Sequence, residues 1–131
     1  MCMIDKLMTK NVITVNKHTS IRDAVVVFIE NNITGVPVVD DDNNLVGIIS
    51  EKDVLRLIYD FEDTPDSVEK YMTKQVVVFK PEDDLKEVCR SLKNNHIRRV
   101  PIVVDGKLEG IITRRDIVKY ILKQKHRHAA I

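Results

Sequence analysis

The sequence predicts a mixed α/β fold made of two β-α-β-β-α repeats, packed sheet to sheet with pseudo-twofold symmetry. Three motifs carry this prediction, because each occurs twice at nearly the same spacing. Met8-Thr9-Lys10 returns 64 residues later as Met72-Thr73-Lys74, and Val36-Pro37-Val38-Val39 returns 64 residues later as Val100-Pro101-Ile102-Val103. Gly47-Ile48-Ile49-Ser50 returns 63 residues later as Gly110-Ile111-Ile112-Thr113. A nearly constant offset across the whole chain indicates an internal duplication.

The elements of the two copies follow the same order. Short apolar strands are predicted over 12–15 and 76–79. A helix follows each, because apolar residues recur at i, i+3, i+4 and i+7 from Ile21 and from Leu85, with Ser20 and Asp84 as typical N-caps. Strands are then predicted over 36–39 and 45–49, and over 100–104 and 108–112, where Asp105-Gly106 signals a tight hairpin. The last helices are predicted over 51–59 and 114–123.

These elements divide the chain into a first repeat over 3–60, a polar connector over 61–67, a second repeat over 68–124 and a basic tail over 125–131. Each copy provides three strands and helices for only one face of the sheet. The other face would stay apolar and exposed, so we expect the two copies to bury it against each other.

Composition excludes several classes of protein. The 131 residues are 44% apolar with a net charge of +1, which favours a globular core and disfavours nucleic-acid binding. We find no signal-peptide pattern and no apolar run of transmembrane length, so a cytoplasmic protein is expected. Cys2 and Cys89 have no metal-type spacing, and no activated nucleophile or acid/base pair stands out. We therefore expect no enzymatic activity, no metal and no required cofactor.

Candidate binding residues lie where a strand passes directly into a helix, at Ser50 to Asp53 and at Thr113 to Asp116. A helix start offers unpaired N–H groups to a phosphate, and a carboxylate can accept hydrogen bonds from the two hydroxyls of a ribose. The same Ser/Thr-x-x-Asp pattern is also an ordinary helix cap. The residues alone leave both interpretations open.

The repeated Val-Pro and Gly-Ile-Ile-Ser/Thr-x-x-Asp motifs resemble a tandem CBS-domain pair, or Bateman module, over roughly residues 3–124. The resemblance implies two clefts between the sheets that bind AMP, ADP, ATP or S-adenosylmethionine as regulatory ligands. It implies that Asp53 and Asp116 hold the ribose, and that Ser50 and Thr113 approach ribose or phosphate. It also implies a homodimer formed through the helices.

The resemblance further assigns the walls of each cleft by position. One site would have Asp116 facing Thr9, Ile13, Thr34, Gly35, Val36 and Pro37, and the other Asp53 facing Thr73, Val77, Arg99, Val100 and Pro101. An apolar slot with backbone donors suits an adenine ring. Arg98-Arg99 replaces Thr34-Gly35 in the second copy, and guanidinium groups suit phosphate, so AMP, ADP or ATP is favoured over S-adenosylmethionine.

Two other functions are considered. Arg98, Arg99, Arg114, Arg115 and the tail could form a basic face that binds nucleic acid, although aromatic residues for base stacking are few. The chain could also be a ligand-free dimerisation scaffold. Because no partner domain is recognised in this sequence, we expect the regulated target to be a separate protein.

Overall fold

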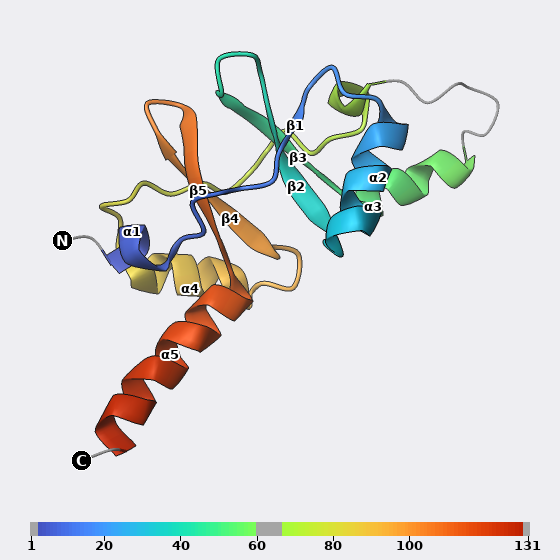
Figure 1. Cartoon of the computed structure of the whole chain (residues 1–131). Coiled ribbons are helices and arrows are strands. Elements are labelled where there is room, and N and C mark those ends of the chain that lie inside the picture. Colours follow the sequence, from blue (N-terminus) through green and yellow to red (C-terminus); the bar gives the residue numbers. More distant parts are fainter. Residues whose placement is uncertain (1–2, 60–66, 130–131) are drawn as a thin grey trace. The chain divides into compact units, whose positions relative to one another are not determined.

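The structure, a computed structural model, describes residues 3–59 and 67–129, and the side chains of 3–57 and 67–124 (Figure 1). The predicted connector over 61–67 lies outside the described residues except for Ser67, as do the side chains of the predicted tail over 125–131. The chain forms two compact units, which are described one at a time. The first unit comprises residues 13–76, and the second unit comprises residues 1–12 and 77–131.

The compact units differ from the sequence repeats because two short segments change places. Residues 3–12 open the first repeat but fold with the second unit, and residues 68–76 open the second repeat but fold with the first unit. Two pairs of backbone hydrogen bonds hold the segments there. Thr9 pairs with Ile111 at 2.9 and 3.0 Å, and Thr73 pairs with Ile48 at 2.9 and 2.8 Å. The predicted sheet-to-sheet packing of the two repeats stays a prediction.

The first unit contains a three-stranded sheet in the order β1-β2-β3. β1 (Val15–Asn16) is parallel to β2 (Gly35–Val39), which is antiparallel to β3 (Leu45–Ser50). β1 is shorter than the strand predicted over 12–15. The helices are α2 (Ile21–Asn31), α3 (Glu51–Leu55), and the 3₁₀ helices η1 (Arg56–Tyr59) and η2 (Val68–Lys70). The core consists of the predicted apolar face of α2, the sheet and Val68.

The second unit contains β4 (Arg99–Val104) and β5 (Lys107–Thr113), an antiparallel pair joined by Asp105 and Gly106, both with positive φ. The third strand predicted over 76–79 is reduced to one parallel bridge between Phe79 and Ile102. The helices are α1 (Met3–Leu7), α4 (Leu85–Lys93) and α5 (Arg114–Ala129), and α5 continues beyond its predicted end at Lys123. The core joins α1 and α4 to the strands, with Ile4, Val88 and Ile102 fully buried.

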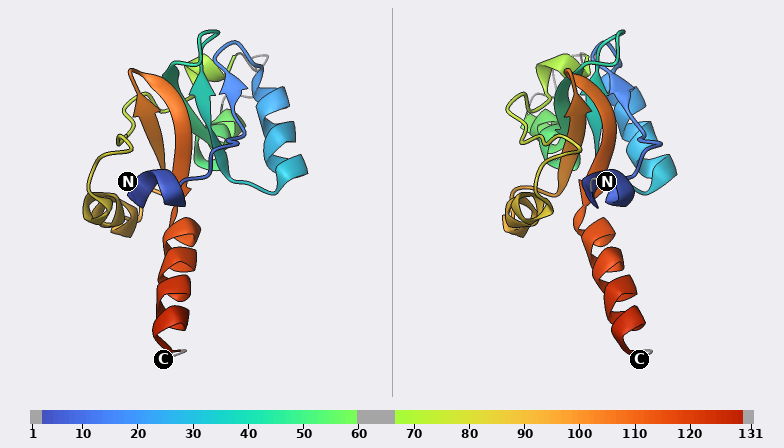
Figure 2. Two further views of the ribbon diagram at one scale, coloured as in Figure 1. Left: turned by 60° about the vertical axis from the view of Figure 1, so that its left-hand side comes forward. Right: turned by 90° about the vertical axis from the view of Figure 1, so that its left-hand side faces the viewer.

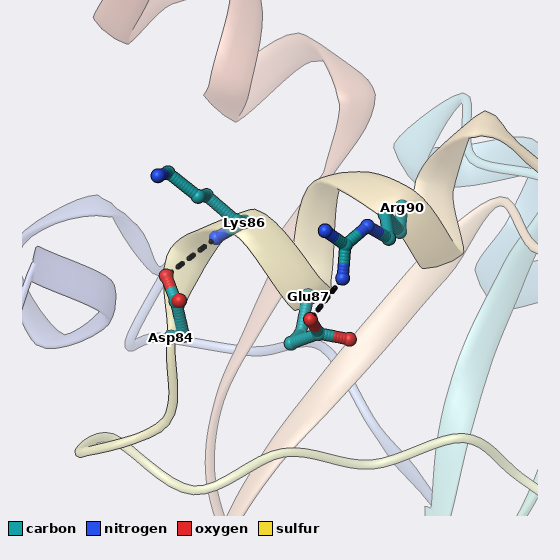
Figure 3. A network of polar contacts seen from close by, with 4 residues as sticks. All are labelled: Asp84, Lys86, Glu87 and Arg90. Atoms are coloured by element: carbon teal, nitrogen blue, oxygen red, sulfur yellow. Dashed lines mark hydrogen bonds and ion pairs between the residues drawn. The ribbon is translucent and has the colours of Figure 1, made fainter.

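The predicted N-caps are confirmed at the start of both long helices after the first strands. The Ser20 hydroxyl accepts a hydrogen bond from the Asp23 N–H at 3.1 Å, and the Asp84 carboxylate accepts one from the Lys86 N–H at 3.0 Å. Figure 3 shows the second cap, and an ion pair between Glu87 and Arg90 on the next turn. Such caps satisfy N–H groups that have no partner inside the helix.

Two glycines allow the exchanged segments to lie close to the sheets. A Cβ atom on Gly110 would stand 2.6 Å from the Met8 sulfur, and one on Gly47 would stand 2.8 Å from both the Met72 sulfur and the Thr73 carbonyl oxygen. Any larger residue would displace these neighbours. Close packing against these segments therefore explains why the first residue of each Gly-Ile-Ile motif is a glycine.

No helix among the described residues combines the length and the apolar character that crossing a membrane requires.

Candidate ligand-binding sites

The first candidate site lies where β3 passes into α3. The Asp53 Oδ2 atom accepts hydrogen bonds from the Ser50 N–H at 2.9 Å and from the Ser50 hydroxyl at 3.0 Å. The Asp53 Oδ1 atom accepts a third hydrogen bond from the Thr73 hydroxyl at 3.2 Å. Asp53 is only 8% exposed, so its carboxylate accepts hydrogen bonds from two hydroxyls at a largely desolvated position.

The second candidate site repeats this arrangement where β5 passes into α5. The Asp116 Oδ2 atom accepts hydrogen bonds from the Thr113 N–H at 2.8 Å and from the Thr113 hydroxyl at 3.2 Å. The Asp116 Oδ1 atom accepts from the Thr9 hydroxyl at 3.5 Å. Asp116 is half-buried and Thr9 is exposed. The exchanged segments thus provide one threonine to each aspartate.

This geometry establishes the capping role of both aspartates, because each carboxylate accepts the backbone N–H of the residue just before the helix. Capping still leaves each carboxylate able to accept a further hydrogen bond. An ionised carboxylate has about four acceptor positions, of which three are occupied in each site. The threonine and serine hydroxyls beside it can each exchange their present partner for a ligand oxygen.

The strand pairing shows which other residues share a face with these hydroxyls. Directly opposed residues of an antiparallel pair project to the same side of the sheet, as do residues two positions along. Gly35 opposes Ser50 and Pro37 opposes Ile48; Arg99 opposes Thr113 and Pro101 opposes Ile111. Each unit therefore presents a hydroxyl, a proline and an isoleucine along one face of its hairpin.

The predicted site residues fall into two sets, one for each unit. Ile13, Thr34, Gly35, Val36 and Pro37 lie in the first unit with Asp53, whereas Val77, Arg98, Arg99, Val100 and Pro101 lie in the second unit with Asp116. Their predicted position opposite the other aspartate stays a prediction.

The predicted residues also differ in how accessible they are. The side chains of Val36 and Val100 are buried in the two cores, at 1% and 0% exposure, so only their backbone could reach a ligand. Ile13 and Val77 are each 42% exposed, which leaves apolar surface open at equivalent positions of the two repeats.

A charge difference separates the two sites. Arg99 is half-buried at the start of β4 and shares its end of the hairpin with Thr113, while Arg98 beside it is exposed. The residue that opposes Ser50 in the first unit is Gly35, which has no side chain. Among the described residues, the second unit thus has an arginine at the backbone position paired with the hydroxyl residue of its site, and the first unit has a glycine there.

Sequence reasoning missed the role of Arg114, which was predicted to belong to a basic face. Its guanidinium donates hydrogen bonds to the Leu92 carbonyl oxygen at 2.6 Å and to the Asn94 carbonyl oxygen at 3.0 Å. Arg114 therefore caps the C-terminal end of α4, where carbonyl groups lack helical partners. No local pattern signals this contact, because about twenty residues separate the partners in the sequence.

The described residues contain no group of three or more His, Cys, Asp or Glu side chains arranged to hold a metal ion.

Comparison with known proteins identifies the class to which this arrangement belongs. Residues 4–60 and 68–123 each match the CBS domain. The chain belongs to the CBS-domain family and is a tandem CBS-domain pair.

Individual relatives extend the comparison. The uncharacterized protein MJ1225 of Methanocaldococcus jannaschii is 37% identical over 118 residues, which make up 90% of this chain and 42% of that protein. An inosine-5'-monophosphate dehydrogenase of the same organism is 39% identical over 127 residues, or 96% of this chain and 24% of that protein. The chain thus spans less than half the length of these relatives, and CBS domains also occur within enzymes.

Two solved structures have the same fold over nearly their whole length. A crystal structure of CBSX2 in complex with AMP is 33% identical with a TM-score of 0.85, covering 93% of this chain and 97% of that one. The CBS-domain pair of protein MJ0100, in complex with 5'-methylthioadenosine and S-adenosyl-L-methionine, is 27% identical with a TM-score of 0.78, covering 95% and 98%. Both similar proteins therefore bind adenosyl compounds.

Proposed function

We propose that this chain is a non-catalytic regulatory module that binds an adenosine-containing ligand at the Ser50–Asp53 and Thr113–Asp116 sites. The observation that carries the proposal is the repeated cluster of a carboxylate and two hydroxyls drawn from separate segments. A ribose has two neighbouring hydroxyls, and such a carboxylate can accept a hydrogen bond from each of them. The adenosyl ligands of CBSX2 and MJ0100 support this choice of ligand class.

The ligand we favour is an adenine nucleotide, AMP, ADP or ATP. Arg99 pairs with Thr113 along the backbone of the hairpin, and charged hydrogen bonds from arginine to phosphate are about twice as strong as neutral ones. Ile13 and Val77 offer open apolar surface of the kind that covers a base. S-adenosylmethionine is the alternative adenosyl ligand, because it also has the ribose but lacks the phosphate.

We propose further that the module acts as a homodimer on a separate target protein. Large apolar side chains are exposed on helices of both units, including Ile29 at 74%, and Leu55 and Leu122 each at 67%. Exposed apolar residues on several helices are typical of surfaces that associate. Nucleic-acid binding is the less favoured alternative, because the Arg114 guanidinium is hydrogen-bonded to carbonyl groups at the end of α4.

The proposal is tested by calorimetric titration of the whole chain with AMP, ATP and S-adenosylmethionine. We expect saturable binding of one of these, and at least a tenfold loss in Asp116→Ala, because removing a charged acceptor costs about 1.5–3 kcal/mol. Glu109→Ala is the matched control, since Glu109 is an exposed carboxylate on β5 of the same unit.

Two results would contradict the proposal. If no adenosyl compound binds a cooperatively folded wild-type protein, Asp53 and Asp116 are helix caps only and the ligand-free dimerisation scaffold is the better account. If binding occurs but Asp53→Ala and Asp116→Ala both behave like Glu109→Ala, the ligand lies elsewhere on the chain.

A further inference from the structure

A second surface of the second unit lies between α1 and α5, beginning beside Asp116 and extending along α5. It is an open groove of about 590 Å³. In Figure 2, α1 lies beside the first part of α5, and α5 continues beyond it. Eight residues line the groove: Met3, Lys6, Leu7, Asp116, Lys119, Tyr120, Lys123 and Gln124.

The groove carries positive charge that the described residues do not neutralise. Lys6, Lys119 and Lys123 are exposed, and none of them forms an ion pair with a carboxylate in the described part of the chain. The one acidic lining residue, Asp116, offsets only one of the three lysine charges, so the lining stays net positive. Lys119 and Lys123 also stand four residues apart on α5, a spacing at which like charges repel.

Between the lysines the groove is apolar. Met3 is 40% exposed, and Leu7 and Tyr120 are half-buried. The combination of an apolar floor with a basic rim is complementary to a segment that has apolar residues on one side and carboxylates on its edge. The one-turn spacing of Lys119 and Lys123 matches carboxylates placed four residues apart on a second helix.

We propose that this groove docks an acidic amphipathic helix of a partner protein. Small-molecule sites are typically concave and bury most of the ligand, whereas here exposed lysines border an open groove along two helices. Asp116 belongs to both the groove and the Thr113–Thr9 cluster. Docking and the proposed ligand binding therefore share a residue, so that a ligand bound at Asp116 would change the affinity of the groove for the partner.

The probe is a fluorescein-labelled synthetic helical peptide with leucines and glutamates each spaced four residues apart, titrated into the whole chain by fluorescence anisotropy. We expect saturable binding at low salt that weakens as salt rises, because exposed ion pairs are screened. Lys119→Glu with Lys123→Glu should weaken binding about tenfold or more, since two attractive contacts become repulsive. Met3→Ser should weaken it several-fold.

The matched control is Lys86→Glu with Lys93→Glu. These lysines are exposed on α4 of the same unit, outside the groove, so the net charge changes equally. The control should bind the peptide within about twofold of wild type, apart from the weaker effect of net charge at a distance. Equal losses in the two double variants would overturn the proposal, because binding would then follow net charge alone.

Other outcomes would show that the groove binds something other than an acidic helix. Equal binding of a peptide with lysines in place of glutamates, or no saturable binding of the acidic peptide, would overturn docking of an acidic helix. Binding of inorganic tripolyphosphate with the same lysine dependence, without peptide binding, would identify a small-anion site. Loss of dimer in the groove variant alone, measured by sedimentation, would identify a second copy as the occupant. All titrations omit nucleotide, so failure here leaves the proposed ligand site standing.

Discussion

The two units repeat the same hydrogen-bonding arrangement but differ in burial and charge. In both, an aspartate at a helix start accepts from the preceding backbone N–H, from a neighbouring hydroxyl and from a threonine of the exchanged segment. Asp53 is nearly buried and its threonine lies at 3.2 Å, whereas Asp116 is half-buried and its threonine lies at 3.5 Å. The duplication has thus kept the local geometry that caps the helix, while the surrounding charge has diverged.

The divergence includes the backbone position paired with the hydroxyl residue of each site. Arg99 faces Thr113 in the second unit, and Gly35 faces Ser50 in the first. Under the proposed function, both units would recognise a ribose, and only the second unit would recognise phosphate. The following predictions test the units against each other, beginning with the largest expected effect.

The glycines under the exchanged segments should differ in their tolerance of a methyl group. Gly47→Ala should lower the free energy of unfolding by about 1–3 kcal/mol, because the new Cβ would meet a backbone carbonyl as well as Met72. Gly110→Ala should cost less, since its nearest neighbours are side-chain atoms of Met8 and the carbonyl stands at 3.0 Å. Urea unfolding of the two variants measures the difference, and a larger loss for Gly110→Ala would contradict it.

The aspartates should differ in their contribution to stability. Asp53→Ala should lower the free energy of unfolding by about 1–2 kcal/mol, the upper range for a lost helix cap, because the group is nearly buried. Asp116→Ala should cost about half as much, because water can replace the carboxylate at a half-buried position. Chemical unfolding at neutral pH measures both, with the near-isosteric Asp53→Asn as control. Equal losses would show that burial does not distinguish the two caps.

The helix starts differ also at the residue that follows the cap. Arg114→Ala should lower the free energy of unfolding by about 1 kcal/mol, because it removes two hydrogen bonds to the end of α4. Glu51 occupies the equivalent position in the first unit and is exposed, so Glu51→Ala should be close to neutral. Thermal unfolding of the two variants provides the comparison. If Arg114→Ala leaves the stability unchanged, the hydrogen bonds from Arg114 to the end of α4 do not stabilise the fold.

The smallest expected effect concerns the turns of the two hairpins. The first unit has a longer turn in which hydrogen bonds from Asn44, and from the Asp42 N–H, hold the pKa of Asp40 below its ordinary value. A group with a lowered pKa stabilises the fold above its ordinary pKa, and this contribution is lost as pH falls through the lowered value. Asp40→Asn should therefore flatten the acid side of the stability profile slightly. A profile identical to wild type in acid would contradict this.

Much of the fold could be predicted because the repeated motifs mark elements whose partners are local. The hairpins, the apolar faces of α2 and α4 and the caps at Ser20 and Asp84 all depend on residues close in the sequence. The family resemblance predicted that Thr9 faces Asp116 and that Thr73 faces Asp53. The residue patterns alone could not predict the exchange of residues 3–12 and 68–76, since both segments contain the same Met-Thr-Lys motif. The strand predicted over 76–79 was too long, because the described backbone there pairs with β4 only in the bridge between Phe79 and Ile102.

The candidate sites were predictable to the same extent. The Ser/Thr-x-x-Asp spacing identified both carboxylates, but it could not distinguish a cap from a ligand site, because the same hydrogen bonds serve both. The contact between Arg114 and α4 and the groove of α1 and α5 depend on tertiary packing. No sequence periodicity reports such contacts.

The most direct test of the central comparison is calorimetric titration of wild type and Arg99→Ala with AMP and with adenosine. If Arg99 binds phosphate as proposed, Arg99→Ala should weaken AMP binding by about tenfold or more while leaving adenosine binding within about twofold of wild type. Equal losses for AMP and adenosine would contradict the account. Arg99 would then support the site as a whole, and the two units would not differ in phosphate recognition.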